Sequence, residues 1–349
     1  MHGVDTDRRP FVLVWELTQA CELTCDHCRA DAQRDRHPDE LSTAEGKALL
    51  DSARDFGEGQ LVVFSGGDPC KRDALEELIE YGTDIGLTIT LTPSGTDSLT
   101  PETIERLADT GLKRLALSID GASAASHDDF RGESGSFEQT LEAARTAREV
   151  GLPLQVNTTV CERTVDELRG LCGLVADLDA VLWSVFFLVP VGRGRVLDPV
   201  TPERAEGVMD WLADVVESEE FAVKTTEAPH YRRVLQQRDD IESGRRGGIT
   251  AGDGFAFVSH TGEMYPSGFL PESAGNVRET DAVSLYRDAD LFESLRDLDG
   301  KCGVCPFRTV CGGSRSRAYA YTGDPLASDP LCPYVPPGYD GPLPDQQLP

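Results

Sequence analysis

The chain has 349 residues, of which 33 are Lys or Arg and 61 are Asp or Glu, so its formal net charge is −28. Such a charge repels phosphate groups, and no basic patch in the sequence offsets it, which argues against nucleic-acid binding. A hydrophobic content of 39% is enough for a folded core and excludes a wholly disordered chain.

The acids are spread along the chain, and 28 of the 33 basic residues are arginines. This predicts a solvated acidic surface suited to a halophilic, high-salt cytoplasm; an acidic face for a basic partner is the alternative. Residues 1–10 lack a signal-peptide core, and the longest apolar run, residues 181–191, is too short to span a bilayer. We therefore expect a cytoplasmic protein with no membrane partner, whose ten cysteines bind metal or pack in the core rather than form disulfides.

Short apolar runs alternate with amphipathic stretches from residue 11 to about residue 220. The six expected strands cover residues 11–17, 60–65, 88–92, 114–119, 154–160 and 181–190. The six expected helices cover residues 43–56, 72–85, 101–110, 137–150, 164–178 and 202–218. Strict alternation predicts parallel strands, and six units are too few for a closed eight-unit barrel. The predicted fold is α/β, a partial (βα)6 TIM-type barrel or an open sheet, with the site at the C-terminal ends of the strands.

The pattern changes beyond residue 220. Residues 241–280 are glycine-rich, with strand-like pieces at 254–260 and 262–265 and a short expected helix at 292–298. A cysteine-rich segment then forms a C-terminal extension. We expect four parts: a flexible N-terminus at 1–9, the barrel at 10–222, the extension at 223–335, and a proline-rich, extended or disordered tail at 336–349.

Three cysteines follow the first expected strand as Cys21, Cys25 and Cys28, with C-x3-C-x2-C spacing. Thiolates this close can converge on one centre and favour zinc, copper(I) or iron–sulfur. Zinc needs a fourth ligand, for which His27 is a neighbour, but adjacent residues rarely reach the same metal. Three thiolates on a cubane cluster leave one iron open, so the spacing favours a catalytic iron–sulfur cluster over zinc or unligated cysteines.

This segment resembles the cysteine motif of the radical S-adenosylmethionine (SAM) enzymes. The resemblance implies a 4Fe-4S cluster on Cys21, Cys25 and Cys28 whose open iron binds the amino and carboxylate groups of SAM. It implies reductive cleavage of SAM to a 5′-deoxyadenosyl radical that abstracts a substrate hydrogen. His27, before the third cysteine, is then expected to pack on the adenine.

A second motif follows the second expected strand as Gly66-Gly67-Asp68-Pro69. It resembles the family's G-G-E-P loop, whose backbone holds the methionine ammonium of SAM, with Asp in place of Glu. The glycines permit close approach of backbones, and in isolation the motif would indicate only a turn.

Polar residues at later strand ends also match positions of that family. Ser118, Asp120 and Asn157 are implied to contact the methionine carboxylate and the ribose of SAM. Arg131, in an expected loop at residues 127–132, is implied to pair with the carboxylate, which suits a guanidinium fork. Without the resemblance, each would be read as an ordinary structural residue.

Four cysteines near the C-terminus, Cys302, Cys305, Cys311 and Cys332, have spacing that suits zinc and iron–sulfur equally. They resemble the SPASM or twitch extension of radical SAM enzymes, although a full SPASM domain carries seven cysteines for two clusters. The resemblance implies one auxiliary 4Fe-4S cluster, without an open iron, that relays electrons. The remaining cysteines, Cys70, Cys161 and Cys172, lack metal spacing and are expected to pack, with Cys70 near the site.

The sequences of residues 15–18, 28–32 and 311–320 resemble those of the tetrapyrrole branch of these enzymes, which makes haem and haem d1. That implies a porphyrin substrate whose side chains are removed or oxidised through radicals, and an electron donor such as ferredoxin or flavodoxin. Candidate anchors for porphyrin propionates, with surface salt bridges as the alternative, are Arg193, Arg195, Arg232 and Arg233.

Other interpretations stay open from the sequence. His230 and His260 are candidate haem ligands, but structural histidines are more common. A peptide-modifying radical enzyme with a SPASM platform is one alternative function. A non-catalytic module with two zinc sites is another, and a degenerate partner protein conflicts with the intact first cysteine set.

Overall fold

The computed structural model describes residues 5–238 and 249–344. The expected flexible N-terminus, glycine-rich segment and tail therefore lie partly outside the described residues. Residues 333–344, the described part of the tail, contain no helix or strand, as expected for an extended segment.

All six expected strand–helix units are present, with ends close to those expected. The strands are β1 (Val12–Glu16), β2 (Leu61–Ser65), β3 (Thr88–Leu91), β4 (Arg114–Ser118), β5 (Leu154–Val160) and β6 (Leu182–Phe187). The helices after them are α1 (Thr43–Arg54), α2 (Leu75–Asp84), α3 (Pro101–Asp109), α5 (Ser136–Glu149), α6 (Leu168–Asp177) and α7 (Pro202–Ser218). Strands β1 to β6 are parallel and pair in chain order, which confirms the predicted α/β architecture with a partial barrel.

The sheet continues on both sides beyond the six expected strands. β7 (Ala222–Thr226), which was not among the expected strands, pairs parallel with β6. On the other side β9 (Gly254–Val258) pairs parallel with β1, and β8 (Thr250–Ala251), β10 (Glu263–Tyr265) and β11 (Gly275–Asn276) extend that edge. The C-terminal extension therefore shares the barrel sheet, and the division at residue 222 stays a prediction.

Six more helices cover the remaining segments. They are α4 (Ala124–Arg131), α8 (His230–Gln237), α9 (Ala282–Asp288), α10 (Asp290–Ser294), α11 (Gly300–Gly303) and α12 (Arg315–Thr322). α4 was missed, because residues 127–132 were expected to form a loop; the Ser123 side chain caps this helix by accepting from the Ser126 amide. The short helix expected at 292–298 is α10. In the described part of the chain, no helix is both long and apolar enough to cross a membrane.

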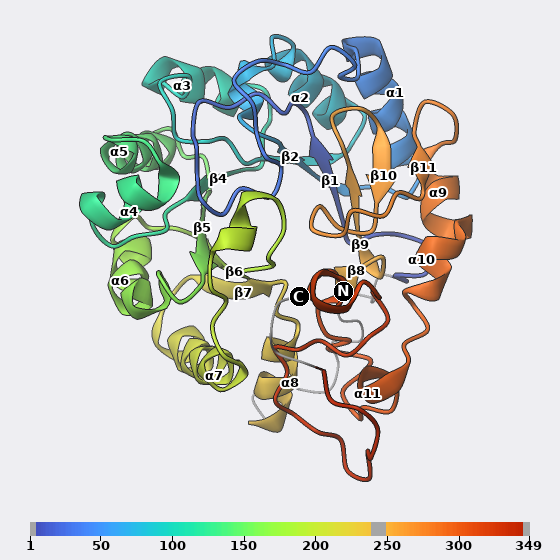
Figure 1. Cartoon of the computed structure of the whole chain (residues 1–349). Coiled ribbons are helices and arrows are strands. Elements are labelled where there is room, and N and C mark those ends of the chain that lie inside the picture. Colours follow the sequence, from blue (N-terminus) through green and yellow to red (C-terminus); the bar gives the residue numbers. More distant parts are fainter. Residues whose placement is uncertain (1–4, 239–248, 345–349) are drawn as a thin grey trace.

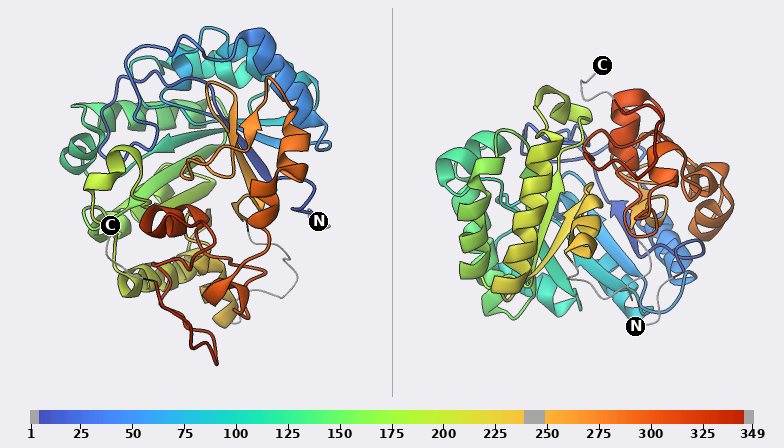
Figure 2. Two further views of the ribbon diagram at one scale, coloured as in Figure 1. Left: turned by 45° about the vertical axis from the view of Figure 1, so that its right-hand side comes forward. Right: turned by 90° about the horizontal axis from the view of Figure 1, so that it is seen from below.

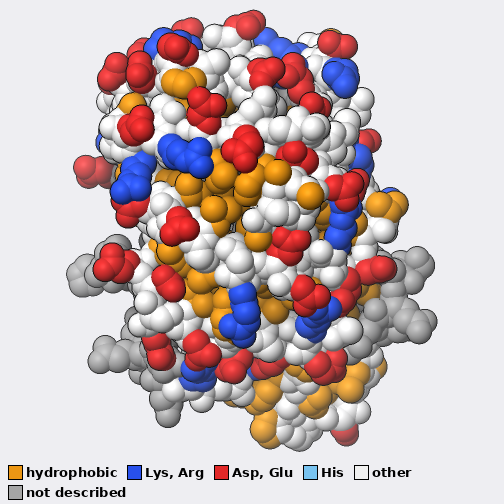
Figure 3. Space-filling model, turned by 90° about the vertical axis from the view of Figure 1, so that its left-hand side faces the viewer, with side chains coloured by type: hydrophobic (Ala, Val, Ile, Leu, Met, Phe, Trp, Pro, Cys, Tyr) orange, Lys and Arg blue, Asp and Glu red, His pale blue; other side chains and the backbone are white. Residues whose placement is uncertain are grey.

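Alternate residues of each strand face opposite sides of the curved sheet. The outer set, including Leu13, Trp15 and Phe64, is fully buried beneath helices that surround the sheet (Figure 1). The inner set includes small or β-branched side chains such as Val14 and Val63, and the barrel interior is open. The C-terminal segments pack together beside β1 and below the barrel (Figure 2). Figure 3 shows acidic side chains scattered over one face around a band of hydrophobic ones.

A buried carboxylate joins the extension to the barrel. Asp329 is fully buried; its Oδ2 lies 3.1 Å from Nε2 of His230 and 3.2 Å from Nη1 of Arg317, and it accepts the Ser314 amide at 2.6 Å. Arg317 also donates to the backbone oxygens of Phe187 and Leu188 at the end of β6. Burial alone would raise the pKa of Asp329, but Arg317 and His230 outweigh it and hold that pKa well below its usual range.

We expect Asp329→Asn to lower the free energy of unfolding by about 3–5 kcal/mol, because Arg317 would remain buried without a counter-charge. Urea unfolding of the variant and of Asp340→Asn, an exposed control, measures the difference. A loss no larger than that of the control would show that Asp329 does not hold the extension in place.

Candidate active site

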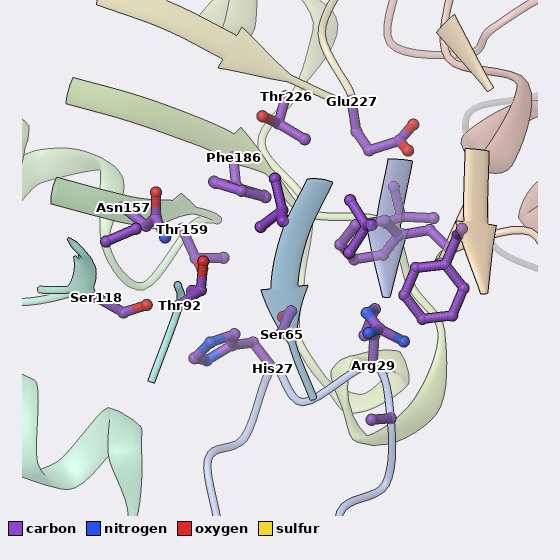
Figure 4. A pocket seen from close by; sticks show the side chains of 18 of the residues that line it. His27, Arg29, Ser65, Thr92, Ser118, Asn157, Thr159, Phe186, Thr226 and Glu227 are labelled. Atoms are coloured by element: carbon purple, nitrogen blue, oxygen red, sulfur yellow. The ribbon is translucent and has the colours of Figure 1, made fainter. Parts of the chain in front are cut away.

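The inner side chains of the strands enclose a cavity of about 650 Å³. It runs from the cysteine segment after β1, past every barrel strand, to the first residues of the extension. Figure 4 shows polar side chains of neighbouring strands converging on it, among them Ser65, Thr92, Asn157 and Thr159. Because parallel strands end at one edge of a sheet, these groups meet at the end where the cysteines lie.

Cys21, Cys25 and Cys28 all line one wall of this cavity. Arg193, which lies outside this segment in the sequence, holds it in place. It donates from Nε to the Cys25 backbone oxygen at 2.9 Å and from its backbone amide to the Cys28 backbone oxygen at 3.0 Å. Burial raises the pKa of Cys25 to about 11, and nearby Arg131 opposes that rise. Arg193 lines the cavity but is engaged in bracing this segment, which favours its structural interpretation over a propionate anchor.

The glycines of the Gly66-Gly67-Asp68-Pro69 loop touch the backbone that precedes Cys21. A Cβ on Gly66 would lie 2.4 Å from the Thr18 oxygen, and one on Gly67 would lie 2.4 Å from the Ala20 oxygen. No side chain fits at such distances, so these residues permit two backbone segments to cross. Both glycines line the cavity.

The other two residues of the loop support it rather than face the cavity. Asp68 accepts from Oγ1 of Thr96 at 2.7 Å and from the amides of Cys70 and Ser94, and neither it nor Pro69 lines the cavity. Their predicted contribution to SAM binding, through the loop backbone, stays a prediction.

A charged cluster lies beside the cysteines. Arg131 Nη1 is 3.3 Å from Asp120 Oδ2 and 3.5 Å from His27 Nε2, while the His27 ring stacks on Phe130 with centroids 4.7 Å apart. Burial lowers the pKa of His27 to about 4, against the pull of Asp120. Burial would raise the pKa of Asp120, but His27 and Arg131 hold it below its usual value.

Sequence reasoning predicted these three residues but placed Arg131 in a loop, which is wrong. Arg131 is the last residue of α4, and its side chain is directed back toward the cysteines. Its Nε and the Nδ1 of His27 are buried without hydrogen-bond partners. Buried polar atoms without partners are rare in proteins, so these atoms of Arg131 and His27 are available to bind a polar ligand.

Ser118 and Asn157 line the cavity, and Gln155 donates to Asn157 Oδ1 at 2.6 Å; their predicted contact with SAM stays a prediction. Sequence reasoning missed Glu227, which follows β7 and accepts from the hydroxyls of three serines in the extension: Ser267, Ser314 and Ser316. It adopts a positive φ of 55°, which is uncommon for a residue with a side chain. An unusual polar residue directly after a strand was the available signal, but the seventh strand had not been recognised.

The four C-terminal cysteines, Cys302, Cys305, Cys311 and Cys332, line a second, small cavity. Burial raises the pKa of Cys311 to about 12 and that of Cys332 to about 11. Arg315 donates from Nη2 to the Cys302 Sγ at 3.4 Å, a contact suited to a thiolate. Among the described residues no group of three His, Cys, Asp or Glu is arranged to hold a single metal ion.

The remaining candidates have structural partners. His230 pairs with Asp329, and His260 Nδ1 lies 2.6 Å from Glu16 Oε1. Cys161 and Cys172 are buried away from both cavities, and Cys70, half-buried, follows the glycine loop without lining either.

Of the other three proposed propionate anchors, two lie outside the main cavity. Arg195 is exposed, and Arg233 pairs with Glu206 beside the second cysteine set. Arg232 lines the main cavity but donates to the backbone oxygens of Val310 and Ile249.

Comparisons with known proteins agree with this geometry. The Radical SAM superfamily profile matches residues 15–174. The AdoMet-dependent heme synthase of Methanosarcina barkeri is 41% identical over 341 residues, covering 94% of this chain and 97% of that protein. The pre-heme d1 synthase of Dinoroseobacter shibae is 30% identical, covering 92% and 85%. The crystal structure of Streptococcus suis SuiB bound to S-adenosylmethionine shares the fold, with a TM-score of 0.77, 17% identity, and 94% and 78% coverage.

We expect Gly67→Ala to destabilise the protein by about 1–3 kcal/mol, because the new methyl group overlaps the Gln19 and Ala20 oxygens. Gly173→Ala is the matched control: it lies in α6 with no atom within 4 Å of the added methyl, so the helix gains up to about 1 kcal/mol. Thermal or urea unfolding measures both. Equal effects of the two substitutions on stability would contradict the inference that the two backbone segments cross closely at Gly67.

Proposed function

Because the chain belongs to the radical SAM superfamily, we propose that this enzyme cleaves SAM reductively and uses the resulting radical to modify a tetrapyrrole side chain. The observation that supports this most is the position of Cys21, Cys25 and Cys28 on the wall of a large, mostly unfilled barrel interior. Likeness over nearly the whole chain to a heme synthase supports the substrate class.

The residues present suit a cluster and its cofactor. Cys21 and Cys25 are buried, Cys28 is half-buried, and all three lie near Arg131. The charge of Arg131 favours the thiolate forms of Cys21 and Cys25, and its partnerless Nε is available to the SAM carboxylate. When bound, the cluster would supply the electron that splits SAM into methionine and a 5′-deoxyadenosyl radical. The backbone of Gly66 and Gly67, with Ser118 and Asn157, would orient SAM, and the surrounding walls would keep water from the radical.

The cavity walls suit a large ring with acidic side chains. Val14, Val63, Phe186 and Phe257 supply apolar and aromatic surface, and polar groups are placed among them, several at the strand ends. Apolar walls with a few placed polar groups are typical of sites for bulky ligands. The size of the cavity therefore supports a tetrapyrrole better than a small metabolite.

For the second cysteine set we propose one auxiliary 4Fe-4S cluster of SPASM or twitch type, held by Cys302, Cys305, Cys311 and Cys332. Four cysteines lining one small cavity, with Arg233 and Lys301 beside them, support this proposal. Four thiolates leave no iron open, so the cluster would relay electrons from a donor such as ferredoxin or flavodoxin. The acidic composition supports a high-salt cytoplasm as the working environment.

The proposal predicts that anaerobically reconstituted enzyme, reduced and given SAM with an iron porphyrin that carries propionates, releases 5′-deoxyadenosine and changes the porphyrin mass. We expect Cys25→Ala to abolish both products, because one cluster ligand is lost. Cys172→Ala, buried in α6 outside both cavities, serves as the control and is expected to keep both. Mass spectrometry of the two products provides the measurement.

The outcomes of this assay separate the alternatives. Release of 5′-deoxyadenosine with a modified peptide but no change in any porphyrin would contradict the tetrapyrrole substrate and favour a peptide maturase. Failure to release 5′-deoxyadenosine from iron-loaded wild-type enzyme would contradict the proposed chemistry itself.

Iron analysis tests the auxiliary cluster separately. We expect about eight irons per wild-type chain and about four in each of Cys25→Ala and Cys311→Ala, because each cubane holds four. The auxiliary cluster would be contradicted if the second cysteine set held zinc in place of iron. In that case wild type would contain about four irons, and Cys311→Ala would contain as many.

A further inference from the structure

Two basic side chains face the barrel interior. Arg114 is the first residue of β4, and Lys224 lies in the middle of β7; both line the main cavity. Ser118, at the opposite end of β4, is four residues on, which at about 3.3 Å per residue places Arg114 roughly 13 Å along the strand from the expected SAM end. Thr226, two residues after Lys224, points into the cavity in Figure 4, so this face of β7 is the inner one.

These two cations lack a counter-charge. Neither forms an ion pair with an acid in the described ranges, 5–238 and 249–344, and the Nε of Arg114 is buried without a hydrogen-bond partner. The side chain of Lys224 is exposed to the open interior, and that of Arg114 is half-buried. The surrounding protein and then repulsion from Arg114 lower the pKa of Lys224 to about 8. Burial lowers the pKa of Arg114.

The other arginines of this cavity are engaged within the protein. Arg29 pairs with Glu16 at 2.9 Å and Arg131 with Asp120 at 3.3 Å, whereas Arg193 and Arg232 donate to backbone oxygens. In a chain with 61 acids and 33 basic residues, a structural cation has many acids available. Two cations that line the same open interior without an acidic partner are therefore available to an anion from outside the protein.

We propose that Arg114 and Lys224 form a carboxylate-binding subsite that anchors a propionate of the tetrapyrrole at the end of the cavity opposite the cysteines. This inference rests on the proposed function and deepens it. One carboxylate satisfies the partnerless guanidinium of Arg114 and neutralises the repulsion between the two cations. An anchor at this end directs the far side of the macrocycle toward Cys21, Cys25 and Cys28, so the subsite selects which side chain reacts.

The test measures binding to the cluster-loaded enzyme. Coproporphyrin III, a porphyrin with four propionates, and its tetramethyl ester are titrated by fluorescence quenching. We expect Arg114→Gln and Lys224→Met each to weaken binding of the free acid by about tenfold or more, with little change for the ester. Exposed basic residues supply the controls, Lys113→Met and Arg145→Gln, which are expected to match wild type. Arg114→Lys keeps the charge and is expected to recover most of the lost affinity.

Three results would overturn the subsite. Unchanged affinity of the variants for the free acid would show that the two cations do not bind carboxylates, while leaving the proposed function intact. An equal loss for the acid and the ester would show a general change in cavity shape. If wild-type enzyme binds neither porphyrin form, the proposed substrate fails and the subsite with it. Iron content and thermal unfolding of each variant confirm that it folds and loads.

Discussion

One buried carboxylate, that of Asp329, links the two halves of this molecule. It pairs with His230 at the start of α8 and with Arg317 on α12, while Arg317 reaches the carbonyl groups at the end of β6. A buried charge is tolerated only where partners surround it. Asp329 therefore holds α8, α12 and the end of β6 in one arrangement relative to one another. Ser314, whose amide also binds Asp329, precedes α12 and reaches Glu227 at the cavity. The position of the second cysteine set and the shape of the main cavity therefore depend on the same contact.

A second constraint, at the other end, is steric. The chain crosses itself where Gly66 and Gly67 meet the backbone of residues 18–20, and a single methyl group on either glycine would overlap a carbonyl oxygen. That crossing directs the segment after β1 over the barrel mouth, where Arg193 fixes it from the opposite side. The first cysteine set is thus positioned by packing and backbone hydrogen bonds, before any metal contributes.

Periodicity predicted the six repeating units well, because each strand buries an apolar face and several of the helices have a clear cap, as Ser42 provides for α1. β7 was missed because only partly buried and exposed residues form it, as suits an edge strand beside an open cavity. α4 was missed because its residues have few apolar positions. Cysteine spacing and the glycine motif pointed to residues that line the main cavity, whereas Glu227, Arg114 and Lys224 reach the same cavity only through the curvature of the sheet.

The unfilled interior explains how charge is distributed in this acidic chain. In a closed eight-stranded barrel, bulky side chains fill the centre, whereas here the inner faces, which include several valines, serines and threonines, leave it open. Most acidic side chains are spread over the surface, where solvent screens their charge. The few cations that line the interior interact more strongly with a bound charge, because the dielectric constant there is lower than in water. Those with internal partners, such as Arg131 and Arg29, hold the site together. Those without, Arg114 and Lys224, remain available to an acidic ligand, so the negative surface and the positive interior together favour a substrate that is bulky, apolar and carboxylated.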